Sequence, residues 1–180
     1  MNKRVFLAIN LPKETKKEIF ELFCSALSQK EFKIVEEENL HITLLFLGYL
    51  NEDAIEKLKE KMNSLRKFKQ FNAVIGGIGN FNLRVLWVRV REGAKEIEEI
   101  AKKLVELVGV KEEERFHAHI TVARTRKEAD RKKVKEKLSE LEKIKFEETV
   151  WIKSIDLMES VLSPKGPKYS LIYSAELKKN

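Results

Sequence analysis

The strongest constraint on the fold of this 180-residue chain is a pattern of residues that occurs twice. Residues 4–7 read Arg-Val-Phe-Leu and residues 84–87 read Arg-Val-Leu-Trp. His-Ile-Thr-Leu begins at His41, 37 residues after the first segment starts, and His-Ile-Thr-Val begins at His119, 35 residues after the second starts. A period of about 80 residues is too long for a solenoid repeat. The sequence therefore predicts two similar lobes related by a pseudo-two-fold axis, with a cleft between them.

Hydrophobic periodicity predicts the same order of elements in both halves. The strands are predicted at residues 4–10, 40–47, 71–81, 84–91, 119–123, 150–161 and 169–177. Helices are predicted after Pro12, after the N-cap residue Asn51, and at residues 94–108 and 128–141. A turn rich in proline at residues 163–167 separates the last two strands. We expect a single domain, residues 1–180, with lobes at about 1–80 and 81–180 and C-terminal strands that can cross between them.

Composition indicates a folded, basic protein. Hydrophobic residues make up 43% of the chain and charged residues 36%, a balance typical of globular rather than disordered proteins. The formal net charge is +7 and the sequence pI is about 9.3. This excess of positive charge favours polyanionic partners, although a well-solvated basic surface gives the same values.

Several classes of protein are disfavoured. Cys24 lies among apolar residues at helical spacing, which predicts a buried, unreactive thiol, and a single cysteine cannot form a disulfide within the chain. The apolar runs are too short for a signal peptide or a membrane span, so we expect a cytoplasmic protein with no membrane contact. Gly76, Gly77 and Gly79 lack the Lys-Ser/Thr of a phosphate-binding loop. They are interpreted as bulges or points of close backbone approach, and ATP-driven chemistry is not expected.

Each repeated motif carries the groups of acid–base catalysis on one face of a strand. Because side chains alternate along a strand, His41 and Thr43 project to one face, as do His119 and Thr121, and the apolar residues between them enter the core. Two such pairs facing each other suit a phosphodiester. One neutral imidazole takes a proton from water, one protonated imidazole gives a proton to the leaving oxygen, and the hydroxyls bind phosphoryl oxygens.

Further charged groups follow the second motif. Arg124 lies five residues after His119 and is the predicted bidentate ligand of the phosphate. A basic run either extends the attraction to a nucleic-acid backbone or is a solvated helix face; it comprises Arg124, Arg126, Arg131, Lys132 and Lys133. His117 and His119 form a His-x-His pair that can bind zinc, but only His41 can be added to it and no acidic residue stands nearby at ligand spacing. We therefore expect no metal, and alternation points His117 away from His119.

At these residues the chain resembles the 2H phosphoesterase superfamily, which is named for two His-x-Thr-x motifs. Within it the chain is most similar to the RNA 2',3'-cyclic phosphodiesterase family, also called 2'-5' RNA ligase. The matching stretches are ENLHITLLFLG at residues 38–48, RVLWV at 84–88 and FHAHITVAR at 116–124. The order of strands and helices extends the likeness to nearly the whole chain. The resemblance implies a bilobal α+β fold with antiparallel sheets lining a central cleft and helices outside.

The resemblance also implies an activity and a site. The activity is metal-independent opening of a 2',3'-cyclic phosphate at an RNA end, without a cofactor, to leave a 2'-phosphate with the 3'-oxygen as leaving group. Reversible, ATP-free joining of RNA ends through a 2'-5' bond is implied as well. Carried onto this chain, the resemblance assigns catalysis to His41 and His119, phosphate binding to Thr43, Thr121 and Arg124, and stacking on the terminal base to Phe46.

Two features depart from the family pattern. Ala118 stands where family members usually have proline before the second motif histidine. Strict alternation points Phe46 and Arg124 away from the faces that carry the histidines, unless a twist or bulge near the strand end redirects them.

The leading interpretation is a monomeric hydrolase acting on RNA with a 2',3'-cyclic phosphate end or on a cyclic nucleotide. In it His119 activates water and His41 protonates the leaving oxygen, although near-symmetry permits the reverse. The nearest alternative is the same site working mainly as an ATP-independent 2'-5' ligase on cleaved tRNA. A non-catalytic module that binds RNA ends or nucleotides is the alternative from another class, but binding alone does not need two titratable groups.

Overall fold

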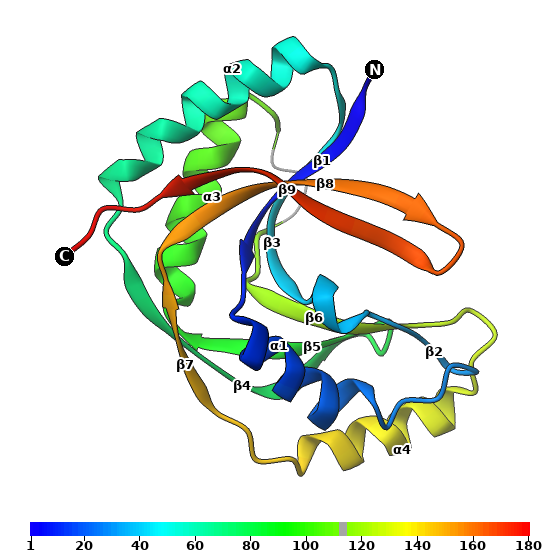
Figure 1. Ribbon diagram of the computed structural model, residues 1–180. Helices are drawn as coiled ribbons and strands as arrows, with labels where there is room; N and C mark the ends of the chain where they lie inside the picture. Colours follow the sequence, from blue (N-terminus) through cyan, green and yellow to red (C-terminus); the bar gives the residue numbers. More distant parts are fainter. Residues whose placement is uncertain (112–114) are drawn as a thin grey trace.

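The computed structural model describes residues 1–111 and 115–180 (Figure 1). Its strands are β1 (Lys3–Asn10), β2 (Phe32–Ile34), β3 (His41–Leu50), β4 (Phe71–Phe81), β5 (Val85–Glu92), β6 (His119–Thr125), β7 (Glu148–Ile152), β8 (Ser154–Ser163) and β9 (Gly166–Glu176). Its α-helices are α1 (Lys13–Ile19), α2 (Glu52–Met62), α3 (Ala94–Val108) and α4 (Arg131–Glu142). A π-helical turn, Phe20–Cys24, continues α1, and 3-10 turns occupy Glu37–Asn39 and Asn63–Lys67.

The strands form one sheet that is symmetric about its centre. The strand order is β7-β4-β5-β6-β3-β1-β8-β9, with β2 beside β6. The motif strands β3 and β6 pair antiparallel at the centre through Ile42 and Ile120. The strands that begin the two repeats, β1 and β5, flank them on either side. A pseudo-two-fold axis at the Ile42–Ile120 pair requires this strand order. The predicted α+β fold is confirmed, and its antiparallel strands are joined into a single sheet.

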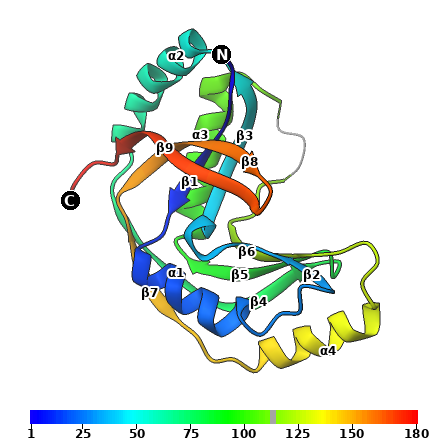
Figure 2. The ribbon, with the colours of Figure 1, turned by 45° about the vertical axis from the view of Figure 1, so that its right-hand side comes forward.

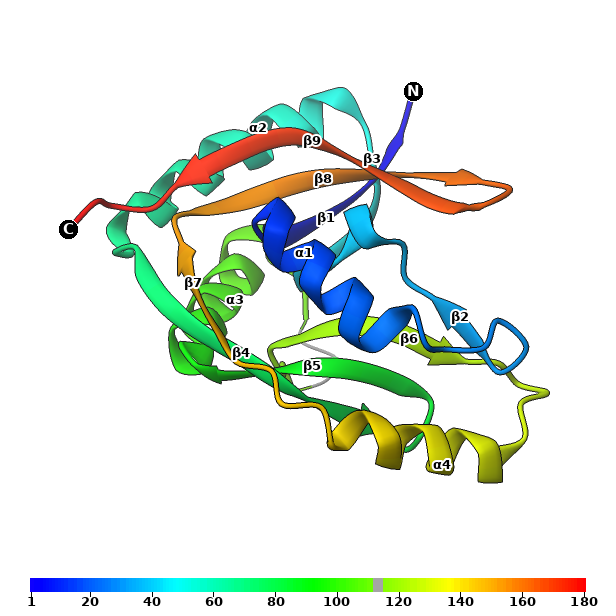
Figure 3. The same ribbon diagram turned by 60° about the horizontal axis from the view of Figure 1, so that its bottom comes forward.

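Each half of the sheet takes strands from both halves of the sequence. β4, which follows the first motif, pairs with β5, whereas β8, which follows the second motif, pairs with β1. The β8–β9 hairpin projects beyond the centre of the sheet on the same side as β2 (Figure 1, Figure 3). The boundary between the lobes at about residue 80 stays a prediction.

Helices cover one face of the sheet and leave the other for polar and aromatic groups. The main core joins helix residues to Leu7 and Ile9 of β1 and to the central pair of isoleucines. α3 packs on β3 and β5, and α4 packs on β4 (Figure 2). Because side chains alternate, Phe6 and Ala8 of β1 project to the opposite face, where they form a small cluster with Met158. We call this opposite face the site face.

The predicted elements are confirmed with a few differences. β2 was not predicted, because three residues carry too short a pattern to recognise. The strand predicted at 150–161 is divided at Lys153, since β7 pairs with β4 and β8 pairs with β1 in the other half of the sheet. α4 begins at Arg131 because the side chain of Asp130 caps it, accepting the Lys132 N–H at 2.9 Å. The predicted N-cap Asn51 is confirmed, and it accepts the Ala54 N–H at 2.9 Å.

Of the three glycines of β4 that were predicted to mark bulges or close approaches, Gly76 and Gly79 stand where other backbone or a ring approaches closely. The β4–β5 register shifts between Ile75 and Ile78, and a Cβ on Gly76 would lie 2.1 Å from the Phe146 carbonyl oxygen. A Cβ on Gly79 would lie 2.4 Å from the indole ring of Trp87. Because Gly76 has no Cβ, β4 can pass close to the segment before β7. Because Gly79 has no Cβ, the indole of Trp87 can pack against β4.

The remaining predictions about the body of the protein concern Cys24 and the membrane. Cys24 is buried, as predicted, and burial raises the pKa of its thiol to about 12. Among the helices of residues 1–111 and 115–180, none is long and apolar enough to span a bilayer.

Candidate active site

The two motifs meet at the centre of the sheet. Ile42 and Ile120 are Cα partners in the antiparallel β3–β6 pair, and both side chains are fully buried in the core. Carrying this register one residue either way sets His41 opposite Thr121 and Thr43 opposite His119, on the face away from the core. The four predicted motif residues therefore share a small area of the site face.

Each motif imidazole is held in the same way by its own backbone. The Nδ1 of His41 donates to the carbonyl oxygen of Asn39 at 2.6 Å, and the Nδ1 of His119 donates to the carbonyl oxygen of His117 at 2.6 Å. In both cases the acceptor is two residues before the histidine. Because a carbonyl can only accept, the proton of each neutral imidazole lies on Nδ1, which leaves Nε2 as the basic nitrogen.

The first motif has a further hydrogen bond at Nε2 of its histidine. The Nε2 of His41 lies 2.7 Å from the hydroxyl oxygen of Thr43, which donates to it when the imidazole is neutral. Asn10 is the β1 partner of His41, and its side-chain amide donates to the buried carboxylate of Asp156 at 2.7 Å. The first imidazole thus contacts a hydroxyl directly, and the neighbouring strand carries an amide that is fixed by a carboxylate.

Burial shifts both histidines toward the neutral form. Burial lowers the pKa of His41 from its ordinary value of 6.5, the bond to the Asn39 carbonyl opposes this, and the charges of Lys16 and His119 lower the pKa further. Burial also lowers the pKa of His119, the bond to the His117 carbonyl opposes this, and the charges of His117 and Arg124 add to the lowering. Two neighbouring imidazoles that disfavour each other's charge suit a pair in which one is protonated at a time.

Matched β-bulges bring Phe46 and Arg124 to the site face. In the β1–β3 pair the register passes from Ala8–Thr43 to Leu7–Leu45, which leaves one residue of β3 without a partner. The β5–β6 pair skips Val122 in the same way. An extra residue reverses the alternation beyond it, so that residues five positions after each motif histidine return to the face of that histidine.

Contacts agree with these orientations. The ring of Phe46 lies 5.9 Å from the ring of Phe6, which in turn lies 5.2 Å from His41. The charge of Arg124 lowers the pKa of His119 and also acts on Tyr169 of β9. The structure therefore brings all six predicted site residues to one face of the sheet.

The prediction that His117 points away from His119 is wrong. The rings of His117 and His119 are 6.0 Å apart, and His117 lies 4.9 Å from the ring of Trp87. Strand alternation does not apply to His117, since β6 begins at His119. Ala118, which replaces the proline of the family pattern, is buried between the two histidines.

Several residues near the histidines were not predicted from the sequence. Tyr169 packs edge-on against His41 with ring centroids 5.4 Å apart, and Lys16 of α1 donates to the carbonyl oxygen of Glu38 at 3.0 Å. The partial burial of Lys16 lowers the pKa of its amine, and the charges of Glu38 and Asp156 oppose that shift. The sequence marks neither residue, because their placement depends on how α1 and β9 pack around β1 and β3.

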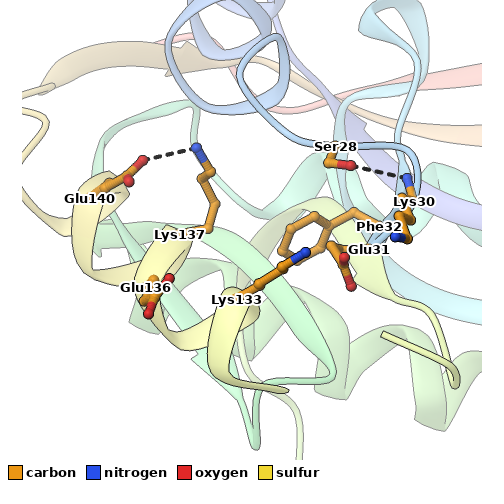
Figure 4. A pocket seen from close by; sticks show the side chains of 8 residues that line it. All are labelled: Ser28, Lys30, Glu31, Phe32, Lys133, Glu136, Lys137 and Glu140. Carbon is orange, nitrogen blue, oxygen red and sulfur yellow. Dashed lines mark hydrogen bonds and ion pairs between the residues drawn. The ribbon is translucent and has the colours of Figure 1, made fainter. Parts of the chain in front are cut away.

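Other candidate sites do not share these features. In residues 1–111 and 115–180 no group of three histidine, cysteine or acidic residues is placed to hold a metal ion. A pocket of about 290 Å³ lies between the β2 region and α4, and Figure 4 shows lysines and glutamates around it. Its lining includes Lys133 of the predicted basic run, but Lys137 is already bonded to Glu140 at 2.8 Å. Its mixed charge does not favour a phosphate.

Solved structures share this fold. The structure matches that of Escherichia coli LigT complexed with ATP with a TM-score of 0.79 at 23% identity, covering 98% of each chain. It matches a protein of Thermus thermophilus with a TM-score of 0.79 at 26% identity, again covering 98% of each chain. The symmetric sheet with a His-x-Thr pair on each central strand defines the class of two-histidine phosphoesterases.

Sequence comparisons give the family. The family model described as the 2'-5' RNA ligase superfamily matches residues 12–161. A relative from Methanocaldococcus jannaschii, named RNA 2',3'-cyclic phosphodiesterase, is 37% identical over 175 residues, which cover 94% of this chain and 98% of the relative. A relative of the same name from Thermotoga maritima is 33% identical and covers 96% of this chain and 95% of its own length. The chain therefore belongs to the 2'-5' RNA ligase superfamily, as its motifs predicted.

Proposed function

We propose that this protein hydrolyses a 2',3'-cyclic phosphate at an RNA end to a 2'-phosphate, without a metal ion. The observation that carries the proposal is the matched anchoring of two imidazoles, each with Nδ1 on a carbonyl oxygen, so that Nε2 is the ring nitrogen that can transfer a proton. The names of the relatives support the substrate, since both are called RNA 2',3'-cyclic phosphodiesterase.

The proposed reaction transfers one proton at each histidine. Nε2 of His119 takes a proton from water while the water oxygen bonds to phosphorus. The bond from phosphorus to the 3'-oxygen breaks, and the protonated Nε2 of His41 gives its proton to that oxygen. The products are a 2'-phosphate and a free 3'-hydroxyl. His119 ends protonated and His41 neutral, so a proton exchange with solvent restores the starting state.

The remaining predicted residues bind the substrate in this proposal. The hydroxyls of Thr43 and Thr121 donate to the phosphoryl oxygens, and when substrate enters, Thr43 exchanges its bond to His41 for one to phosphate. Arg124 supplies a planar pair of donors for the developing charge. Phe46, which is 65% exposed, stacks on the terminal base. LigT has been solved in complexes with phosphate and with 3'-AMP, ligands with the chemistry of such a terminus.

The test is hydrolysis of a short RNA with a 2',3'-cyclic phosphate end in the presence of EDTA. The expected product carries a 2'-phosphate, which a 2'-specific phosphatase assay or phosphorus NMR separates from a 3'-phosphate. Loss of activity in EDTA with recovery on adding zinc would reject the metal-free mechanism. A 3'-phosphate product would reject the choice of leaving group.

The 2'-5' ligase activity remains a second candidate for the same site, because the matching family model is described by that name. In that reaction a 5'-hydroxyl replaces water as the nucleophile, and no ATP is consumed. Supplying paired tRNA halves and comparing the joined with the hydrolysed product separates the two. The proposal includes a monomeric protein that acts on RNA in the cytoplasm. The mass of the protein in solution tests whether it is a monomer.

A further inference from the structure

Each motif histidine packs against its own group of aromatic rings. The first aromatic cluster surrounds His41 and consists of Phe6, Phe46 and Tyr169, with neighbouring centroids 4.8–5.9 Å apart. The second aromatic cluster surrounds His119 and consists of Phe81, Trp87 and His117, with centroids 4.9–6.0 Å apart. The resemblance gives a role to Phe46 of the first cluster and none to the second cluster.

The two clusters have the same plan of one buried ring below one exposed ring. In the first, Phe6 is 2% exposed and Phe46 is 65% exposed. In the second, Trp87 is 5% exposed and Phe81 is 37% exposed, and His117 beside them is also exposed. The guanidinium of Arg89 lies 5.6 Å from the centre of the Trp87 ring and adds a positive charge to the second cluster.

The turn that follows Phe81 has an unfavourable backbone conformation that hydrogen bonds maintain. In this turn Asn82 and Leu83 have φ values of 51° and 61°, a conformation that a branched side chain such as leucine rarely adopts. The turn is closed by the Arg84 N–H, which donates to the Phe81 carbonyl at 2.9 Å, and the Thr125 hydroxyl donates to the Leu83 carbonyl. Strain that the surroundings maintain in this way gathers at functional sites.

The buried ring below carries a second cost. The indole N–H of Trp87 is buried without a hydrogen-bond partner among the described residues. The strained turn and the unpaired donor thus both lie next to the exposed ring of Phe81, beside His119. Shielding the imidazole from water does not require an exposed ring above a buried indole. A buried aliphatic side chain would exclude water without leaving a buried N–H unpaired.

We propose that the second aromatic cluster stacks a second nucleobase through Phe81 and His117, so that the site recognises an RNA end by two bases. This inference rests on the proposed function. Every base has a flat π surface, so an exposed phenyl and an exposed imidazole accept it without selecting one sequence. Arg89 is the β5 partner of His119 and offers a cation to the phosphate that links the two nucleotides.

The test compares substrates that differ by one nucleotide. The probes are 2',3'-cyclic AMP and an adenylyl dinucleotide that ends in a 2',3'-cyclic phosphate. We expect Phe81→Ala to lower the ratio of kcat/KM for the dinucleotide to kcat/KM for the mononucleotide by about tenfold, the usual effect of one lost stacking contact. Phe81→Tyr keeps a flat ring and is expected to keep the ratio. An equal fall for both substrates, or no change, overturns the proposal.

A matched variant of the first cluster serves as control. Phe46→Ala removes a ring proposed to contact the terminal base, which both probes contain, so the two kcat/KM values are expected to fall together. Melting temperatures of the variants show whether the fold is intact. If the wild-type protein turns over neither probe, the proposed function fails. Calorimetric binding of a 2'-phosphorylated dinucleotide and mononucleotide then tests the stacking independently, and unchanged relative affinity in Phe81→Ala overturns it.

Discussion

Leu44 of β3 and Val122 of β6 are the extra residues of two matched β-bulges, each directly after the threonine of a motif. The bulges restore Phe46 and Arg124 to the face of the histidines, although alternation along an unbroken strand would place them on the other face. Because the two positions are equivalent under the pseudo-two-fold axis, one half of the site receives an aromatic ring where the other receives a cation.

The position of Arg124 leads to the first prediction. Arg124→Gln removes a charged donor from the proposed phosphate site, so we expect kcat/KM for 2',3'-cyclic AMP to fall about 10- to 100-fold, as for loss of a hydrogen bond to a charged group. The matched control is Arg126→Gln. Arg126 is two residues further on and donates to the carbonyl oxygen of Gln29 at 2.7 Å, outside the motif pair. Equal effects of the two substitutions would contradict the proposed role of Arg124.

The bulges also explain how far the sequence could predict the site. The duplicated His-x-Thr pattern is a local signal, so the four motif residues and the symmetry of the fold followed from it. The residues at each bulge, Leu44 and Leu45 in β3 and Val122 and Ala123 in β6, are all apolar. The change of phase is hidden in this continuous apolar run, so the orientation of Phe46 and Arg124 could not be derived from alternation. The role of Phe46 came from the family resemblance alone, whereas Arg124 was also predicted from its chemistry and its position five residues after His119.

Residues brought in by tertiary packing were beyond prediction. Lys16 lies on a charged helix face among other lysines, and Tyr169 lies in a strand whose partner is set by the crossing of β8 to β1. The orientation of His117 was predicted wrongly for a related reason, because strand geometry was applied to a residue before the strand begins. Local periodicity predicts helices and strands, whereas contacts between elements that are distant in the sequence can be identified only once the tertiary fold is known.

The histidine pair gives the second prediction. His41→Ala and His119→Ala are each expected to lower kcat by about 10²- to 10⁴-fold, the usual contribution of a positioned acid or base. If the two groups act in one step, the double variant should be little worse than either single variant, because each loss already disables the concerted transfer. Rapid-quench measurement of a single turnover isolates this step. Fully multiplicative losses in the double variant would indicate that the imidazoles act independently.

The lowered pKa of both histidines predicts an acidic optimum. Activity requires one protonated and one neutral imidazole, and burial lowers the pKa of each from 6.5. The fraction of enzyme with one proton on the pair is then largest below pH 6.5 and declines as pH rises above it. We expect kcat/KM, which reports the free enzyme, to be maximal below pH 6.5. A maximum above pH 6.5 would contradict this.

Lys16 offers a way to distinguish the acid from the base. Its charge lowers the pKa of His41, so Lys16→Met should raise that pKa. At high pH the rate depends on how much of the acid is protonated, whereas at low pH it depends on how much of the base is neutral. If His41 is the acid, kcat/KM rises on the alkaline side and is unchanged on the acid side. If His41 is the base, kcat/KM falls on the acid side instead. Lys17→Met, at an exposed position of the same helix, is the control.

Gly79 links the stability of the sheet to the second aromatic cluster. A Cβ on this residue would lie 2.4 Å from Cη2 and 2.5 Å from Cζ3 of Trp87, so Gly79→Ala must displace the indole from its place beside Phe81 and His119. We expect a loss of roughly 1–3 kcal/mol in the free energy of unfolding, as for other overpacked sites. Trp87→Phe removes the clashing part of the ring. In that background Gly79→Ala should therefore cost less than in the wild type, which a double-mutant cycle of denaturant unfolding measures. An equal cost in both backgrounds would show that the glycine is needed by the backbone and not by the ring.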